Sequence, residues 1–214
     1  MTKVNLFYTD PRLYIACMAK LTRAFYERDD VVQIARELLG KVLVTRIDNV
    51  ITAGRITETE AYNGRTDKAS HAFQKRTPRT EVMYGEGGLS YVYLIYGIHH
   101  LFNVVTNVKG LADAVLIRAV EPVDGLDTMA MRRQMDKGHK RLTSGPGTLA
   151  KAMGIRGQHN ALKLTGDTIW IEEAPLLKPN EVTVSTRIGV DYAGDDAHLP
   201  WRFYETQSRY VSKR

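Results

Sequence analysis

The chain has 214 residues, 43% hydrophobic and 25% charged, which is an ordinary composition for a globular protein. Its 30 Lys and Arg residues against 24 Asp and Glu give a net charge of +6, which suits either a polyanionic partner or simply a basic surface. Cys17 is the single cysteine, which excludes an intrachain disulfide and a thiolate metal cluster. No apolar run approaches a membrane span, so we expect a protein of a reducing compartment without membrane contact, the bacterial cytoplasm or a eukaryotic nucleus.

Residues 23–214 are expected to form one mixed α+β domain, with residues 1–22 as an arm or extension ahead of it. The first helix is expected over residues 31–39, where the apolar residues share one face and Asp29 or Asp30 can cap the start. The other predicted strands cover residues 41–47, 51–62, 91–96, 102–106, 114–120, 168–173 and 182–190, with a turn at Asp48-Asn49 between the first two. We also expect a long polar loop over residues 63–88, and helices over residues 128–140 and from the Gly145-Pro146-Gly147 turn to Ala152.

Glu58, Glu60 and Tyr62 fall on one face of the second predicted strand, because alternate residues of a strand point the same way. Two carboxylates this close crowd each other, so one of them is expected to hold a proton or to meet a cation. Arg118 lies inside an apolar strand, and a buried guanidinium needs an anion, which Glu58 or Glu60 could supply. The alternative is a charged edge strand and an Arg118 side chain that reaches solvent.

Tyr91, Tyr93 and Tyr96 lie within six residues of one another, and their rings could stack on nucleobases or simply pack in a core. Gly97 after Tyr96 favours a sharp turn that presents this ring at a hairpin tip. His71, His99 and His100 lack the spacing of metal ligands, so we expect no metal. Basic side chains that could contact phosphates, or only face solvent, are Arg76, Arg79, Arg132, Arg133 and Lys140.

Short segments between Arg23 and Phe203 together resemble the alkyladenine (3-methyladenine) DNA glycosylase family. Each match is weak alone, but their joint order and spacing are highly specific. The segments are Leu38–Leu43, Glu58–Tyr62, Ala69–His71, Thr77–Arg79, Tyr91–Gly97, Phe102–Val104, Leu116–Ala119, Glu121–Pro122, Ser144–Gly147 and Arg187–Val190.

The resemblance implies a single domain with a curved antiparallel β-sheet, surrounding helices and a protruding β-hairpin. It implies base flipping and removal of alkylated, and sometimes deaminated, purines from double-stranded DNA. We expect a monomer that hydrolyses the N-glycosidic bond without any cofactor and leaves an abasic site in an intact strand. A non-catalytic binder of lesions or bent nucleic acid, and an RNA-processing enzyme, are the alternatives.

Residue by residue, the resemblance implies that Glu60 is the catalytic carboxylate, that Arg118 orients the attacking water and that the Ile188 carbonyl also contacts this water. Thr148 departs from the family, which usually has Lys or Arg there for a phosphate contact. The base pocket is implied at Tyr62, His71, Tyr93 and Asn103, intercalation at Tyr96 and Ile98, and backbone contacts at Arg76, Arg79, Arg132, Arg133 and Lys140.

Overall fold

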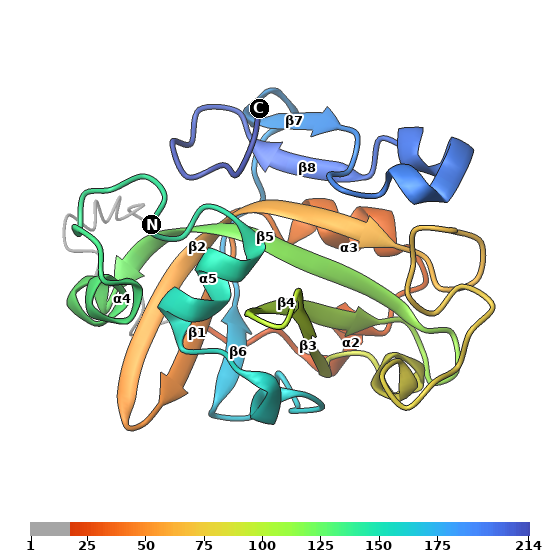
Figure 1. The fold of residues 1–214 in the computed structure, drawn as a ribbon, viewed down its shortest axis with the longest axis horizontal. Helices are drawn as coiled ribbons and strands as arrows, with labels where there is room; N and C mark the ends of the chain where they lie inside the picture. Colours follow the sequence, from red (N-terminus) through yellow and green to blue (C-terminus); the bar gives the residue numbers. More distant parts are fainter. Residues whose placement is uncertain (1–17) are drawn as a thin grey trace, which may run out of the picture.

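The computed structural model describes residues 18–214, and two long antiparallel strands, β2 (Val50–Tyr62) and β5 (Asp113–Asp124), form its centre (Figure 1). The strands of the main sheet follow the order β3-β4-β5-β2-β1-β6, and β8 joins β2 and carries β7. Every pairing is antiparallel, as expected for a sheet built largely from hairpins. The remaining strands are β1 (Val42–Ile47), β3 (Ser90–Ile95), β4 (His99–Thr106), β6 (Ile169–Glu172), β7 (Val182–Ser185) and β8 (Arg202–Glu205).

Strand β2 changes partner halfway along its length. Residues 50–55 pair with β1, whereas residues 58–60 pair with β8, and the register against β5 shifts around Glu58. An irregularity of this kind bends and twists a strand, which explains why the sheet curls. Glu58 and Glu60 therefore lie where β2 is held between β5 and β8.

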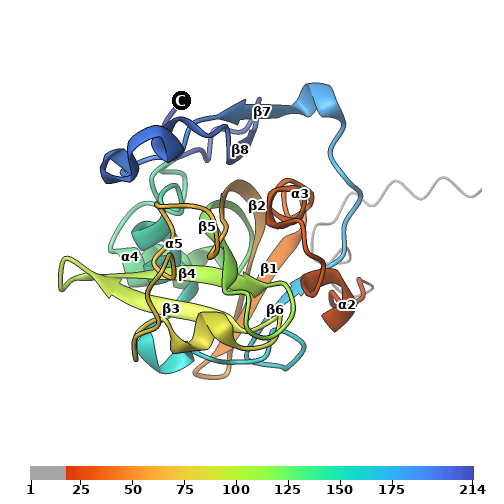
Figure 2. The same cartoon turned by 90° about the vertical axis from the view of Figure 1, so that its right-hand side faces the viewer.

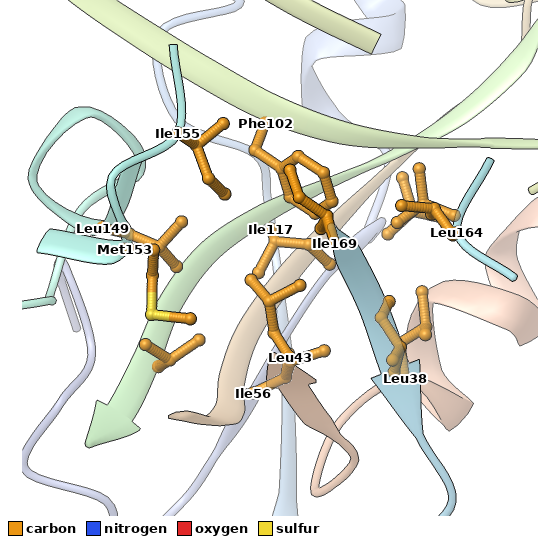
Figure 3. Close-up of a cluster of buried hydrophobic side chains, with 14 of the residues drawn as sticks. Leu38, Leu43, Ile56, Phe102, Ile117, Leu149, Met153, Ile155, Leu164 and Ile169 are labelled. Atoms are coloured by element: carbon orange, nitrogen blue, oxygen red, sulfur yellow. The ribbon is translucent and has the colours of Figure 1, made fainter. Parts of the chain in front are cut away.

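Helices cover the curled sheet and enclose one main apolar core. Asp30 caps the helix α3 by accepting a hydrogen bond from the Gln33 amide at 2.9 Å. Figure 3 shows side chains from the sheet, α3 and α5 meeting in this core, with Phe102 and Ile117 at its centre. The α-helices are α2 (Arg23–Tyr26), α3 (Val31–Glu37), α4 (Leu126–Arg133) and α5 (Pro146–Met153), and the 3-10 helices are η1 (Glu81–Tyr84), η2 (Gly157–His159), η3 (Pro179–Glu181) and η4 (Asp191–His198).

Strands β3 and β4 form a hairpin that projects from the body of the molecule (Figure 2). Tyr96 and Gly97 both have positive φ values, of 53° and 71°, and the Ile98 amide donates to the Ile95 carbonyl at 3.2 Å. Both central residues have the left-handed backbone conformation, and a tight turn of this kind matches the right-handed twist of the two strands that it joins. Its short loop leaves Tyr96 85% exposed and Ile98 73% exposed.

The predicted fold class is confirmed, as are the predicted helix over residues 31–39, the strands from 41 to 120 and the Asp48–Asn49 turn, although several boundaries differ. The helix predicted over residues 128–140 ends at Arg133, because Gln134 adopts a left-handed conformation with φ 52°. The strand predicted over residues 182–190 ends at Ser185. Strand β8 and helix α2 were not predicted, because neither has a clear period of its own.

The arm predicted over residues 1–22 lies mostly outside the described residues, and the division at residue 23 stays a prediction. At its near end, Leu21 is buried in the main core, and Lys20 forms a β-bridge with Glu172. No helix in residues 18–214 has the length and apolar character needed to cross a membrane.

Candidate active site

A cleft of about 580 Å³ lies along one face of the hairpin and extends to the first turn of α5 and the segment before η4. Sites for small molecules typically have volumes in this range. Aromatic side chains dominate one wall, and backbone from the Gly145–Thr148 turn and from residues 188–190 forms the other. The predicted pocket residues Tyr62, His71, Tyr93 and Asn103 all line this cleft, together with Arg118 and Ile188.

Glu60 is fully buried and lies behind the wall of the cleft, against three groups that line it. Its Oε2 accepts hydrogen bonds from the Tyr62 hydroxyl at 2.7 Å and from Arg118 Nη1 at 3.2 Å, and its Oε1 accepts from the Ile188 amide at 2.8 Å. All three partners donate, which fits an ionised carboxylate. A carboxylate offers about four acceptor positions, so Glu60 keeps room to accept from one more donor, such as a water.

Glu58 is also fully buried, but donors from the described residues fill its acceptor positions. Its Oε1 accepts from Arg118 Nε at 3.0 Å, Arg202 Nη1 at 2.7 Å and the Ser212 hydroxyl at 2.8 Å, and its Oε2 accepts from the Ser212 amide at 2.6 Å. Glu58 therefore has little capacity left to take a proton from a reactant. Its position indicates that it neutralises two guanidinium groups and orients Arg118.

Arg118 bridges both carboxylates and is only 6% exposed, so the alternative of a side chain that reaches solvent is wrong. The alternative of an exposed charged edge strand is also wrong, because β2 has neighbours on both sides at Glu58 and Glu60. Paired carboxylates of this kind satisfy a buried guanidinium, as the sequence predicted.

The aromatic wall contains His71, Tyr91 and Tyr93 in mutual contact. The His71 and Tyr93 ring centroids are 4.8 Å apart at 76°, and His71 Nδ1 lies 3.1 Å from the Tyr91 hydroxyl oxygen. Burial, together with the positive charge of Arg79, lowers the pKa of His71 to about 4. The imidazole is therefore neutral at neutral pH, and the wall carries no charge from it.

Two other predicted residues flank this wall. Asn103 is 4% exposed, and its Nδ2 donates to the Tyr91 carbonyl at 3.0 Å, which fixes the amide at the floor of the cleft. The Arg79 guanidinium lies 4.7 Å from the centre of the Tyr93 ring, at the edge of the site. This arrangement places a cation beside the aromatic wall and not over the carboxylate.

The N-terminal turn of α5 packs directly against the hairpin. A Cβ atom at Gly147 would lie 3.0 Å from His99, so this close approach depends on glycine. The Thr148 hydroxyl donates to the Gly145 carbonyl at 2.8 Å, within the same turn. Thr148 lines the cleft, but its side chain is used within the protein.

The other residues predicted to contact the DNA backbone differ in whether their side chains are exposed or bonded within the protein. Arg76 is exposed and paired with Glu81, and Lys140 is exposed. Arg132 and Arg133 are partly buried and donate to the carbonyls of Ala152 and Leu142, at 3.1 and 3.2 Å. Their contacts with DNA stay predictions.

Several residues of the site were not predicted from the sequence. Arg187 is buried in an ion pair with Asp67 and lies 4.9 Å from the centre of the Tyr62 ring, so it holds the loop of residues 63–88 against the cleft. Tyr192 lines the mouth of the cleft and donates to the Ala69 carbonyl at 3.0 Å. These partners are far apart in the chain, and no local pattern links them.

No group of three or more His, Cys, Asp or Glu side chains within residues 18–214 is arranged to hold a metal ion. The three histidines considered as ligands do not all lie in one place. His71 and His99 line the cleft, and His100 lines a different pocket.

Comparison with known proteins gives a consistent result. A family model described as "Methylpurine-DNA glycosylase (MPG)" matches residues 24–209. Relatives named "Putative 3-methyladenine DNA glycosylase" include one from Desulfitobacterium hafniense, 46% identical over 91% of this chain and 99% of the relative, and one from Clostridium acetobutylicum, 44% identical over 90% and 97%. Another, from Methanocella arvoryzae, is 46% identical over 92% of this chain and 98% of the relative. The chain belongs to the methylpurine-DNA glycosylase family.

Proposed function

We propose that the protein is a monofunctional DNA glycosylase that removes alkylated purines, and deaminated purines as further substrates, from double-stranded DNA. The observation that carries the proposal is the buried Glu60, held by Tyr62, Arg118 and the Ile188 amide behind an aromatic cleft. The names of the relatives support 3-methyladenine as a substrate.

The cleft suits an electron-poor purine. Alkylation at a ring nitrogen puts positive charge on the base, and the faces of Tyr62 and Tyr93 attract such a ring. His71 assists because it is neutral, since a protonated imidazole would repel a cationic base. Asn103, which is held at the floor of the cleft, would contact the edge of the base.

In the proposed reaction, Glu60 accepts a proton from water as the water attacks the anomeric carbon. Arg118 and Ile188 keep the carboxylate in place, and its negative charge also stabilises the cationic sugar that forms as the bond breaks. The lining of the cleft, over the described part of the chain, includes no lysine that could act as an amine nucleophile. Hydrolysis would therefore leave an abasic site with the strand intact.

Before hydrolysis, the damaged nucleotide must leave the duplex, which costs a few kcal/mol. Tyr96 and Ile98 are exposed at the turn of the hairpin and would occupy the vacated space. Basic side chains would hold the phosphates of the duplex and make binding strongly salt-dependent. We expect the enzyme to act as a monomer, in bacteria on nucleoid DNA in the cytoplasm.

The test is to incubate the protein with methylated duplex DNA and to measure free 3-methyladenine by chromatography. Release of the base, with a strand that breaks only after alkali treatment, is the expected result. Glu60→Gln serves as the matched variant and should release none. Binding of methylated DNA without release would identify a non-catalytic binder, and activity only on RNA would identify an RNA-processing enzyme.

A further inference from the structure

A second and smaller pocket, of about 280 Å³, lies at the opposite end of α5 from the cleft and has no part in the chemistry described above. Its lining includes four basic side chains and no acidic one. The lining residues are His100, Arg132, Lys151, Gly154, Ile155 and Arg156.

The hairpin separates this pocket from the cleft. Successive residues of β4 point to opposite faces, so His99 and Leu101 line the cleft while His100 lines the second pocket. Helix α5 connects the two sites, with Gly147 at the cleft and Gly154 at the second pocket. At about 1.5 Å per residue, these positions are about 10 Å apart along the helix.

The cations of this pocket are not neutralised by ion pairs. Within residues 18–214, Arg132, Lys151 and Arg156 form no salt bridge with Asp or Glu. Burial lowers the pKa of Arg132; the charge of Asp48 opposes this effect, and the charge of Arg156 adds a smaller lowering. Like charges gathered in a hollow favour an anion that would relieve their repulsion.

One of these cations is fixed in place. Arg132 donates from Nη1 to the Ala152 carbonyl at 3.1 Å, and a Cβ atom at Gly154 would lie 2.8 Å from the guanidinium carbon. The absence of a side chain at Gly154 thus lets Arg132 lie flat against the end of α5. Lys151 and Arg156 are exposed and free to move toward a ligand at the mouth.

The second pocket also lies on the side of the molecule that carries the proposed wedge. Figure 2 shows α4 and α5 on the side from which the β3–β4 hairpin projects. A separation of about 10 Å corresponds to about three nucleotides at 3.4 Å each along one DNA strand. A duplex that is entered by the hairpin and runs along α5 would pass over both sites.

We propose that this pocket binds one backbone phosphate of the damaged duplex, within about three base steps of the extruded nucleotide and on the other side of the hairpin from it. The site rests on the proposed function, because it requires that DNA lie across the hairpin. The site would add a contact with the DNA backbone that the base pocket and the wedge do not provide. A phosphate contact does not distinguish one DNA sequence from another.

The test uses the variant Lys151→Gln/Arg156→Gln, in which both changes are on exposed side chains and Arg132 keeps its structural bond. Binding to a duplex with a tetrahydrofuran abasic-site analogue is measured across a series of salt concentrations. We expect the Kd to rise on the order of 10-fold at low salt, and the slope of log affinity against log salt to fall by about 1, the effect of one lost phosphate contact. Single-turnover excision at saturating enzyme should stay within about 2-fold of the wild type, because no reacting group is altered.

The control is Lys178→Gln, which removes one charge from an exposed residue just ahead of η3 that lines neither pocket. A scan with single uncharged methylphosphonates then locates the contact. One position should weaken wild-type binding and leave the double variant unaffected, because the two changes remove the same interaction.

A double variant that matches Lys178→Gln in both Kd and salt slope, or that remains sensitive at every phosphate position, overturns this site. Failure of the proposed function is distinguished by the wild type itself, which would then release no 3-methyladenine in the same preparation.

Discussion

The two buried carboxylates provide the sharpest prediction, because the structure gives them opposite roles. Glu60→Gln should abolish excision and lower the stability of the protein modestly. Glu58→Gln should lower the stability strongly and retain more of the excision activity. Both changes are isosteric, so packing is conserved and only charge and hydrogen bonding differ. The reason lies in the donors, which leave an acceptor position on Glu60 and fill those on Glu58.

The magnitudes follow from these contacts. Loss of a general base typically lowers the rate by about 100- to 10,000-fold. An amide at position 60 must turn its NH2 toward either the Ile188 amide or Arg118, so at least one charge-assisted bond is lost, about 1.5–3 kcal/mol. An amide at position 58 deprives two buried guanidinium groups of their shared carboxylate, which typically costs about 3–5 kcal/mol. For a chain of this size, the Tm of Glu58→Gln should fall by roughly 6–20 °C.

The assay combines single-turnover excision of 3-methyladenine with thermal unfolding followed by circular dichroism. Glu181→Gln, the same chemical change on an exposed residue, is the control and should alter neither quantity. Excision by Glu60→Gln above about a tenth of the wild-type rate would refute its role as the base. If Glu58→Gln were the less active and the more stable of the two variants, the wrong carboxylate would have been chosen.

Three further predictions concern the hairpin, the floor of the cleft and its aromatic wall. Tyr96→Ser should weaken base extrusion more than hydrolysis, which a fluorescent base analogue at the lesion would report; an unchanged extrusion equilibrium would contradict the wedge. Asn103→Ser should admit undamaged guanine, raising its single-turnover excision from a G·T mispair by roughly 10- to 100-fold, because the smaller side chain leaves room for the exocyclic amino group. A variant that loses hypoxanthine excision and gains none on guanine would instead mark Asn103 as structural. The lowered pKa of His71, about 4 against an ordinary 6.5, means that the unfolded chain binds more protons within that window, so stability should fall as the pH drops from about 6.5 to about 4. His71→Gln should lose this component in Tm measurements across the same range, and an unchanged pH dependence would show that His71 is not its source.

Much of this protein follows from local sequence alone. Period-two alternation predicted the central strands, and it also placed Glu58, Glu60 and Tyr62 on one face. The turns at Asp48–Asn49 and Tyr96–Gly97 were predicted because few residues tolerate positive φ, and the structure has them there. Such features depend on neighbours in the chain and need no knowledge of the fold.

Only the tertiary structure assigns different roles to the two carboxylates. Glu58 and Glu60 are two residues apart and look alike in sequence, but three of the four donors to Glu58 come from Arg202 and Ser212, more than 140 residues away. The buried pair of Arg187 and Asp67, 120 residues apart, likewise holds a loop that sequence left unstructured. Long-range pairing of charges depends on how strands are ordered in the sheet and on where the C-terminal segment packs, and no local sequence period determines either.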